Sequence, residues 1–299
     1  MTGPERQPGA TGFALRDPYA WADLVGLARA GEEAGYRAMF LPEVGARDTL
    51  AALTGLAGET DRLLLGTGVV ALPSRSPALL AMAAATVQER SGGRLLLGIG
   101  TGPAAPGALA RLRSTVEALR LAFAGANGTG DGAPVATDLR LADAPQIWIA
   151  ALGPKATRLA GAIADGVILN WCTPARVAAA TAEVAEGAEA AGRDPAAATI
   201  AVYVRAALAP GTKEAARNAA AAYATYPAYR RQFVDLGIDA ADPDDVVRGV
   251  ILTDPVSARE RLDAYRGAGA HLPVVYPVVP GGVPDAAAAR LTLDLLAPT

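Results

Sequence analysis

The sequence predicts one (β/α)8 barrel that spans residues 1–299, and three observations support this fold class. Short, continuous apolar runs recur along the chain, and a longer helical pattern with capping residues follows each, which is typical of repeated βα units. The runs do not alternate between apolar and polar residues, as expected for parallel strands covered on both faces. There are eight runs, the strand number of this barrel, and 52% hydrophobic content in 299 residues suffices for its core.

We expect strands where these apolar runs end in glycine, proline or polar residues. Their ranges are 12–15, 38–41, 63–70, 95–99, 147–151, 166–170, 200–205 and 272–278. The helices between them are expected to begin near Tyr19, Thr49, Pro77, Gly107, Pro154, Pro174, Lys213 and Asp285. Several begin at proline, whose fixed φ suits the first turn of a helix. The carboxyl ends of the strands therefore define the face on which such a barrel carries its active site.

Two segments interrupt the alternation of strands and helices. Residues 127–139 are rich in Gly, Thr and Asp, so they predict a loop or short excursion before the fifth strand. Residues 223–264 are longer than one crossover requires and contain YATYPAYRRQF, a turn at Gly237 and two further helical stretches. Insertions in barrels commonly lie over the active face, so we expect this insertion before the last strand to help close a substrate pocket.

Composition excludes several classes of function. A formal charge of -3 without a basic cluster argues against nucleic acid as a partner. The longest apolar runs, such as residues 78–87, fall well short of the roughly 20 residues of a membrane helix. The single cysteine rules out an internal disulfide, and the start MTGPERQPGA lacks the pattern of a secretory signal. We therefore expect a cytoplasmic protein whose partner is a small molecule.

Glycines at strand ends mark candidate binding positions. Residues 66–69 (GTGV) end the third strand, and residues 98–102 (GIGTG) end the fourth. The second run fails the dinucleotide fingerprint G-x-G-x-x-G because residue 103 is proline, which argues against a nicotinamide site. We interpret it as a close backbone approach beneath a flat ring. Residues 150–155 leave the fifth strand and enter a helix, whose N-terminal N–H groups favour an anion.

Residues 36–102 and 147–193 resemble the bacterial luciferase-like family of flavin and deazaflavin enzymes. The resemblance rests on ARDTLAALTGLAGETDRLLLGTGVVALPSRSP, RLLLGIGTG and IWIAALGPKATRLAGAIADGVILNW. Within the family, the chain is most similar to the branch that uses coenzyme F420 and includes methylenetetrahydromethanopterin reductase. The resemblance covers most of the chain and implies the same barrel.

The resemblance also implies where the cofactor lies. In the family, a bulge with a non-prolyl cis peptide backs the deazaflavin ring, and this bulge maps onto Gly68 and Val69. The turn that leaves the fifth strand contacts the phosphate of the cofactor tail. With Thr101 as a hydrogen-bonding wall and Asn170 as a polar wall of the pocket, the candidate cofactor-binding residues are Gly68, Val69, Thr101, Gly102, Ala151, Gly153, Pro154 and Asn170.

The candidate catalytic residue is Glu43, which ends the second strand in LPEV. It could orient the cofactor or shuttle a proton, and the alternative is an ion-paired carboxylate at a strand end. Relatives commonly have a histidine after this acid, whereas Val44 follows it here. A relative that oxidises glucose 6-phosphate carries a glutamate after the fourth-strand glycines, and Pro103 stands there in this chain. That sugar-phosphate activity is therefore disfavoured.

The remaining polar residues carry weaker predictions. Arg75 stands where relatives often have an arginine, although Ser76 takes the place of the histidine that follows it there. It meets either the cofactor or substrate rim, or a surface acid. Cys172 lacks an activating partner and is expected to pack. His271 precedes the eighth strand, at the structural end of the barrel, and a single histidine and cysteine provide no zinc site. Four further residues are either pocket residues or packing residues: Tyr203, Arg205, Tyr276 and Arg230.

These features predict a coenzyme F420-dependent oxidoreductase that transfers a hydride between the deazaflavin C5 and a small organic substrate. We expect a reductase of a C=C or C=N bond, because the histidine and glutamate of the dehydrogenase are both missing. The alternatives are an FMN-dependent monooxygenase of the same family, which uses reduced flavin and O2, and a non-catalytic flavin-binding protein. Dimers are common among the relatives, so a homodimer is one expected state, although the sequence does not determine it.

Overall fold

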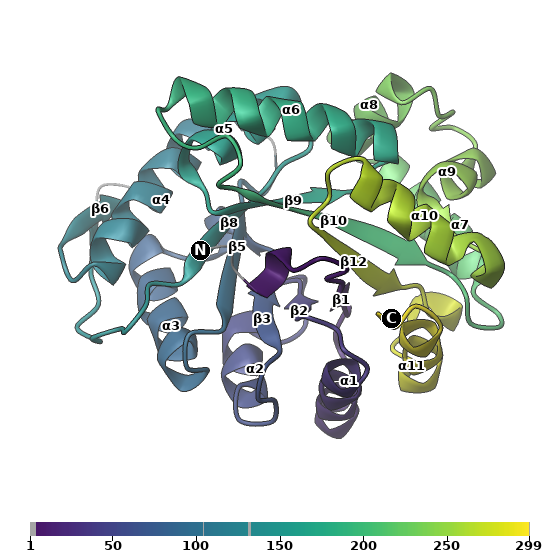
Figure 1. Cartoon of the computed structure of the whole chain (residues 1–299), viewed down its shortest axis with the longest axis horizontal. Coiled ribbons are helices and arrows are strands. Elements are labelled where there is room, and N and C mark those ends of the chain that lie inside the picture. Colours follow the sequence, from purple (N-terminus) through teal and green to yellow (C-terminus); the bar gives the residue numbers. More distant parts are fainter. Residues whose placement is uncertain (1–3, 104, 131–132, 299) are drawn as a thin grey trace.

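The barrel closes as a ring of parallel strands. A computed structural model describes residues 4–103, 105–130 and 133–298. Around the ring the strand order is β1–β2–β3–β5–β8–β9–β10–β12, and β12 pairs with β1 to close it (Figure 1). The strands are β1 Gly12–Ala14, β2 Ala38–Leu41, β3 Leu64–Thr67, β4 Val70–Ala71, β5 Leu95–Gly100, β8 Gln146–Ala150, β9 Gly166–Asn170, β10 Thr199–Ala206 and β12 Leu272–Pro277. The predicted barrel is confirmed, with the third predicted strand divided into β3 and β4.

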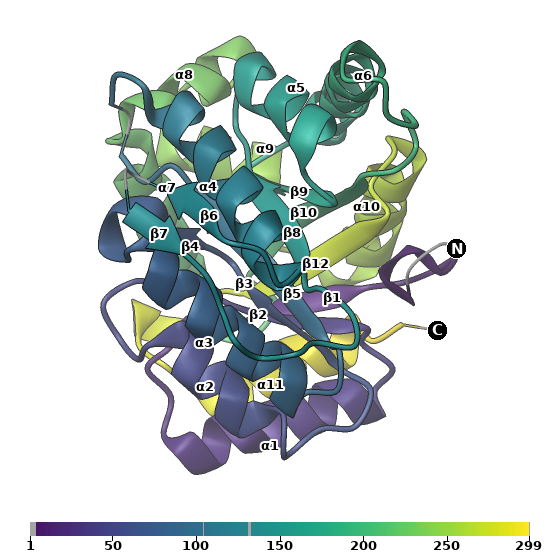
Figure 2. The same cartoon turned by 90° about the vertical axis from the view of Figure 1, so that its left-hand side faces the viewer.

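Helices surround this ring, as the turned view of Figure 2 shows. They are α1 Trp21–Glu33, α2 Thr49–Leu56, α3 Pro77–Arg90, α4 Ala108–Phe123, α5 Pro154–Ile163, α6 Pro174–Ala190, α7 Lys213–Ala224, α10 Pro255–Gly267 and α11 Ala286–Leu295. Side chains of Asp48 and Ser76 cap α2 and α3 by accepting backbone N–H bonds. Proline opens α3, α5, α6 and α10. These local signals explain why the predicted helix starts agree with the structure.

Both predicted interruptions are present. The excursion of residues 127–139 forms an antiparallel hairpin of β6 Gly128–Gly130 and β7 Ala133–Val135, with residues 131–132 outside the described part. The longer insertion contains the end of α7, then α8 Pro227–Asp235, α9 Pro243–Val250, β11 Ile251–Leu252 and most of α10. Strand β11 pairs parallel with the end of β10, outside the ring. Helix α8 contacts the loop after β9, so the insertion lies over the carboxyl ends of strands, as expected.

Two apolar layers make the core. Alternate residues of the strands fill the barrel, with Phe40, Trp148 and Tyr203 as its largest interior side chains. The ring centroid of Phe40 lies 6.0 Å from that of Trp148 and 5.8 Å from that of Tyr203. The opposite faces of the strands pack against the surrounding helices. The barrel interior is therefore a packed core, and the working surface is restricted to its ends.

The N-terminal segment closes the end opposite the predicted site. The short helix η1, Pro4–Arg6, lies across the centre of the barrel in Figure 1. Glu5 is 2% exposed and accepts hydrogen bonds from Gln146 and Thr199, which begin β8 and β10. Arg6 contacts the His271 ring, so His271 lies at this structural end, as predicted. Among the described helices, none combines the length and apolar character required to cross a bilayer.

Candidate active site at the carboxyl ends of the strands

The bulge between β3 and β4 lies at the centre of the site. The peptide bond from Gly68 to Val69 is cis, as the sequence resemblance implied. The Gly68 N–H donates to the Leu41 carbonyl at 2.7 Å, which holds the bulge against β2. Gly68 and Val69 are both partly exposed, whereas the strand before them is buried. The bulge therefore presents backbone, and little side chain, to the carboxyl-end face.

Tyr203 of β10 forms a wall behind this bulge. A Cβ added to Gly68 would come within 1.7 Å of the Tyr203 hydroxyl oxygen, so only glycine fits here. The hydroxyl is buried and has no hydrogen-bond partner among the described residues. Burial raises the pKa of Tyr203 well above its ordinary value, so the phenol keeps its proton. Tyr203 thus offers an unused O–H donor beside the bulge.

Glycines in and just after β5 allow this segment to pass close to β3 and the bulge. A Cβ at Gly98 would lie 2.1 Å from the Thr67 carbonyl oxygen, and one at Gly100 would lie 3.0 Å from the Val69 side chain. Gly102 has a φ of +69°, and its Cα faces Pro73. The close approach predicted for this run is therefore made to β3 and the bulge, which explains the glycines without a bound ring.

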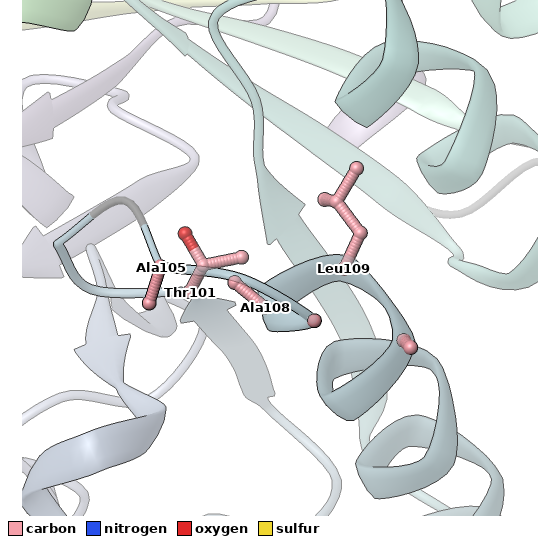
Figure 3. A pocket seen from close by; sticks show the side chains of 6 residues that line it. Thr101, Ala105, Ala108 and Leu109 are labelled. Carbon is pink, nitrogen blue, oxygen red and sulfur yellow. The ribbon is translucent and has the colours of Figure 1, made fainter.

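Thr101 lies at the edge of a shallow cleft after β5. The cleft has a volume of about 360 Å³ and is lined by Thr101, Ala105, Gly107, Ala108, Leu109 and Ala110 (Figure 3). The Thr101 hydroxyl donates to the Gly102 carbonyl at 3.1 Å. Small side chains predominate around this cleft, and none of its lining residues belongs to the bulge.

Glu43 is held by Arg75, and both side chains are about 15% exposed. Arg75 Nη2 donates to Glu43 Oε2 at 2.8 Å, and Arg75 Nε lies 3.0 Å from Oε1. Ser74 also donates to Oε1, at 3.2 Å. The hydrogen bonds that Arg75 donates to Glu43 are the main cause that raises the pKa of Arg75 above its ordinary value, and Asp48 adds to it. The ion-paired carboxylate, which was the alternative to a catalytic Glu43, is thus present, and Arg75 joins the ends of β2 and β4.

Asp48 completes this group. Its carboxylate forms an ion pair with Arg75 and accepts the N–H of Ala51 as the cap of α2. Burial alone would raise the pKa of Asp48, but the hydrogen bonds from Ala51 and Arg75 outweigh it, and the pKa lies below its usual range. Arg75 therefore pairs with two carboxylates at the edge of the site.

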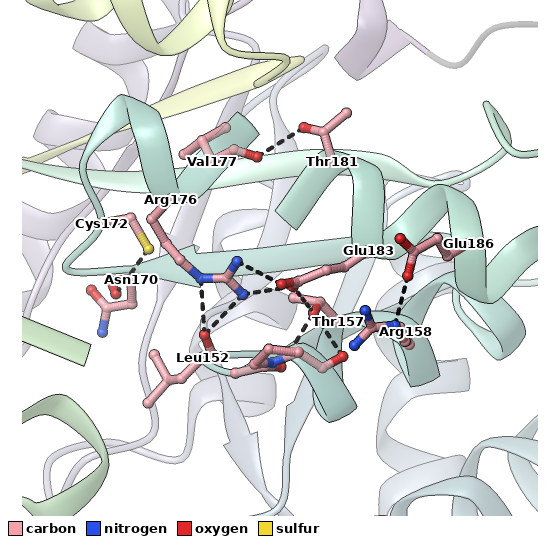
Figure 4. Close-up of polar contacts among 12 residues, drawn as sticks. Leu152, Thr157, Arg158, Asn170, Cys172, Arg176, Val177, Thr181, Glu183 and Glu186 are labelled. Atoms are coloured by element: carbon pink, nitrogen blue, oxygen red, sulfur yellow. Dashed lines mark hydrogen bonds and ion pairs between the residues drawn. The ribbon is translucent and has the colours of Figure 1, made fainter. Parts of the chain in front are cut away.

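The turn from β8 into α5 holds Ala151, Gly153 and Pro154. Figure 4 shows how Arg176 of α6 fixes it, with the guanidinium donating to the Leu152 carbonyl at 3.1 Å and to Glu183 at 2.8 Å. Thr157 of α5 also donates to Glu183. Burial by itself would raise the pKa of Glu183. The hydrogen bonds from Arg176 and Thr157 outweigh burial and hold this pKa below its usual value. A Cβ at Gly153 would meet no atom within 4 Å, so the start of α5 is open.

Asn170 joins β9 to β10 and to the insertion. Its Oδ1 accepts from Arg205 Nη1 at 2.7 Å, and its Nδ2 donates to the Tyr229 hydroxyl at 2.9 Å. Gln232 of α8 donates to the Asn170 and Trp171 carbonyls. Cys172 is buried beside them, and burial raises the pKa of its thiol to about 12, so it packs as predicted and does not act as a thiolate.

Most predicted site residues therefore share the carboxyl-end face, but they belong to separate hydrogen-bonded groups. Glu43 belongs with Arg75, whereas Asn170 belongs with Arg205. Arg230 is exposed on α8. The residues that sequence reasoning missed are Asp48, Arg176, Trp171 and Gln232. No group of three or more His, Cys, Asp or Glu side chains in the described part of the chain is arranged to hold a metal ion.

The fold and site define a (β/α)8 barrel enzyme class with a cis-peptide bulge at the carboxyl end of the third barrel strand. The sequence pattern of one family, described as luciferase-like monooxygenase, matches residues 5–272. The chain belongs to this family.

Curated relatives are named for deazaflavin or pterin chemistry. A 5,10-methylenetetrahydromethanopterin reductase from Methanolobus tindarius is 32% identical over 191 residues, or 59% of this chain and 58% of the relative. An F420-dependent glucose-6-phosphate dehydrogenase from Nakamurella multipartita is 33% identical over 182 residues, or 52% of this chain and 54% of the relative. The matched part thus spans little more than half the length of these relatives.

Solved structures share the whole fold. An F420-dependent secondary alcohol dehydrogenase, in complex with an F420–acetone adduct, has a TM-score of 0.77 at 17% identity and covers 97% of this chain and 98% of its own. The oxygenating constituent of 3,6-diketocamphane monooxygenase from Pseudomonas putida, in complex with FMN, has a TM-score of 0.72 at 19% identity. The match covers 96% of this chain and 97% of the monooxygenase chain. At these identities the comparison establishes the fold alone.

Proposed function

We propose that the protein is a coenzyme F420-dependent oxidoreductase that reduces a C=C or C=N bond of a small organic substrate. The single observation that carries this proposal is the partly exposed bulge at Gly68 and Val69, walled by Tyr203, on the face where barrels of this class do chemistry. The curated relative named as F420-dependent supports the choice of cofactor. When bound, the deazaflavin supplies the hydride.

The residues present fit a flat ring and an anionic tail. Gly68 and Val69 offer backbone to the ring, and Thr101, Gly102 and Asn170 border the same face. The turn of Ala151, Gly153 and Pro154 leaves the start of α5 open, so the Gly153 N–H and the positive end of the helix dipole are offered to the tail phosphate. Arg176 fixes this turn through the Leu152 carbonyl, so it positions the N–H groups.

Glu43 acts, in this proposal, through Arg75 and not as the proton donor. Both of its carboxylate oxygens accept hydrogen bonds from Arg75, so the carboxylate is engaged with the guanidinium. A carboxylate held in this way positions the β4 end of the bulge. The Tyr203 phenol, which stays protonated beside Gly68, is the better-placed hydroxyl donor.

The test is a binding titration against coenzyme F420 and FMN in parallel, followed by turnover of reduced F420 with a panel of electron-poor alkenes and imines. We expect tight binding of F420, weak binding of FMN and oxidation of reduced F420 only when an acceptor is present. Binding of neither cofactor would refute the proposal. F420 binding without turnover on any acceptor would favour the non-catalytic alternative.

An FMN-dependent monooxygenase is the second candidate, because the matched family carries that description and an FMN-containing monooxygenase shares the fold. It predicts a preference for FMN in the same titration. It also predicts that reduced FMN and O2 are consumed together when substrate is added, whereas reduced F420 does not readily activate O2.

A further inference from the structure

Arg205 is a buried cation without a carboxylate partner in the described part of the chain. Its exposed fraction is 6%. Its one hydrogen bond to a described residue goes to the neutral amide oxygen of Asn170, at 2.7 Å. Burying a charge is costly unless it is paired, and a guanidinium has five N–H donors. The other arginines near the site, Arg75 and Arg176, both have carboxylate partners.

Aromatic rings surround this guanidinium and take the place of an acid. Its central carbon lies 4.0 Å from the centre of the Trp171 ring, and 4.9 Å from the centres of the Tyr223 and Tyr276 rings. Such cation–π contacts stabilise the charge without neutralising it. Ring faces also leave the N–H groups at the edge of the guanidinium plane available, and this edge is what binds a carboxylate.

Three buried polar atoms of nearby residues also lack partners in the described part of the chain. The Trp171 Nε1–H, the Tyr203 hydroxyl and the Gln232 Oε1 are buried and have no hydrogen-bond partner among the described residues. Trp171 contacts Arg205 directly, and the Tyr203 ring centroid lies 5.8 Å from that of Tyr276. Most buried polar atoms in proteins are hydrogen-bonded, so the unused Trp171 donor beside an unpaired cation indicates an absent acceptor.

The position along β10 shows which ligand this acceptor belongs to. Tyr203 and Arg205 are two residues apart, so they lie on the same side of the strand, about 7 Å apart along it. Tyr203 touches the bulge, and Arg205 lies one step nearer to the carboxyl-end face. The open start of α5, proposed for the cofactor phosphate, belongs to a different strand and helix. A group bound at Arg205 would therefore belong to a molecule that lies beside the bulge.

We propose that Arg205, with Asn170 and the Trp171 ring, binds a carboxylate of the substrate, so that the substrate class is a small organic acid. This inference rests on the proposed function, since it names the substrate of the same site. Tyr229 and Gln232 hold Asn170 and the Trp171 backbone from the insertion. They are positioning residues for this carboxylate site.

The first test compares two probes that differ in charge, benzoate and its uncharged isostere benzamide, by calorimetric titration of the protein with and without saturating F420. We expect benzoate to bind at least about 10-fold more tightly than benzamide in both conditions. Equal affinity for the two probes would overturn the proposal. Loss of benzoate binding when F420 is present would overturn it too, because the carboxylate site would then belong to the cofactor.

The second test uses variants. Arg205→Met should remove the preference for benzoate and leave F420 affinity within about 3-fold, and Arg205→Lys should keep part of the preference because the charge remains. Arg158→Met is the control, since Arg158 is exposed and pairs with Glu186 at 2.8 Å. An unchanged benzoate preference in a folded Arg205→Met protein would refute the assignment. The wild-type comparison of the two probes stands even if this variant does not fold.

The failures of the two proposals are distinguishable. If F420 does not bind but benzoate preference depends on Arg205, the carboxylate site stands and the cofactor assignment fails. If F420 binds and benzoate preference is absent, the cofactor assignment stands and the substrate class fails.

Discussion

The hydroxyl oxygen of Tyr203 lies against the Cα of Gly68, at a place where an added Cβ would be only 1.7 Å away. This contact joins β10 to the bulge across the interior of the barrel. It also means that the interior aromatic layer, through Phe40 and Tyr203, determines how far the bulge can move inward.

Gly68→Ala tests this contact. The methyl group cannot fit without displacing Tyr203 or the bulge, so we expect a loss of about 1–3 kcal/mol in the free energy of unfolding and weaker F420 binding. Urea unfolding and a cofactor titration measure the two effects. Gly26→Ala, in α1 with open space around its Cα, is the matched control and should not destabilise the protein. Tyr203→Phe in the Gly68→Ala protein should recover part of the loss, because it removes the nearest atom.

Glu43→Gln separates a positioning role from proton donation. The amide keeps one acceptor for Arg75 but removes the charge, and Asp48 still pairs with Arg75. If Glu43 positions the bulge, we expect a higher KM for the cofactor and an unchanged pH profile of kcat. A kcat that falls about 100-fold or more, with loss of one limb of the profile, would make Glu43 the proton donor instead. Glu59→Gln, at the exposed pair with Arg29, is the control.

Arg176→Met tests the turn at the start of α5. Without the guanidinium, the Leu152 carbonyl loses its donor and Glu183 keeps only Thr157, so the N–H groups after Gly153 are less well fixed. We expect F420 affinity to fall about 10-fold, with a smaller change in kcat. A titration with F420 and steady-state kinetics measure both, and Arg158→Met again serves as the control. An unchanged affinity would place the cofactor phosphate elsewhere.

His271 predicts a pH dependence of stability. The Ile200 N–H donates to its Nδ1 at 3.0 Å, and Arg6 lies 3.0 Å from its Nε2, so an added proton would meet donors on both sides. Burial first, and Arg6 second, lower the pKa of His271 to about 4, below its ordinary 6.5. The unfolded chain therefore binds this proton more readily, and the contribution to stability is complete above pH 6.5 and is lost as the pH falls towards 4.

Urea unfolding of the wild type and His271→Gln between these pH values measures this effect. Glutamine keeps an acceptor for the Ile200 N–H but does not titrate. The free energy of unfolding should therefore fall more steeply with decreasing pH in the wild type than in the variant. Parallel curves would show that His271 does not titrate differently in the folded and unfolded states.

The fold was predictable because its signals are local. Each barrel strand is a short apolar run, and the helix starts carry their own caps, such as Asp48 and Ser76. The division of the third strand at Gly68 was also predictable, but only through the family resemblance. Secondary-structure pattern alone gave one unbroken strand over residues 63–70.

The polar network of the site was not predictable, because its members are far apart in sequence. Asn170 and Tyr229 are 59 residues apart, and Gln232 reaches the Trp171 carbonyl across 61 residues. Glu43 and Arg75 were both candidates, but nothing in the sequence pairs them. One signal was available for Arg205: it is the one charged residue in β10, which is buried over its whole length. A charge in such a strand is rarely structural unless something neutralises it.

The insertion leaves and rejoins the barrel at the same strand. It departs after β10, and β11 returns alongside it, with Ile251 opposite Arg205 and Leu252 opposite Ala206. The ring closes through β12 and β1, away from these helices. A change of shape in the insertion would therefore reach the site through this one strand end, where Tyr229 and Gln232 hold Asn170 and Trp171.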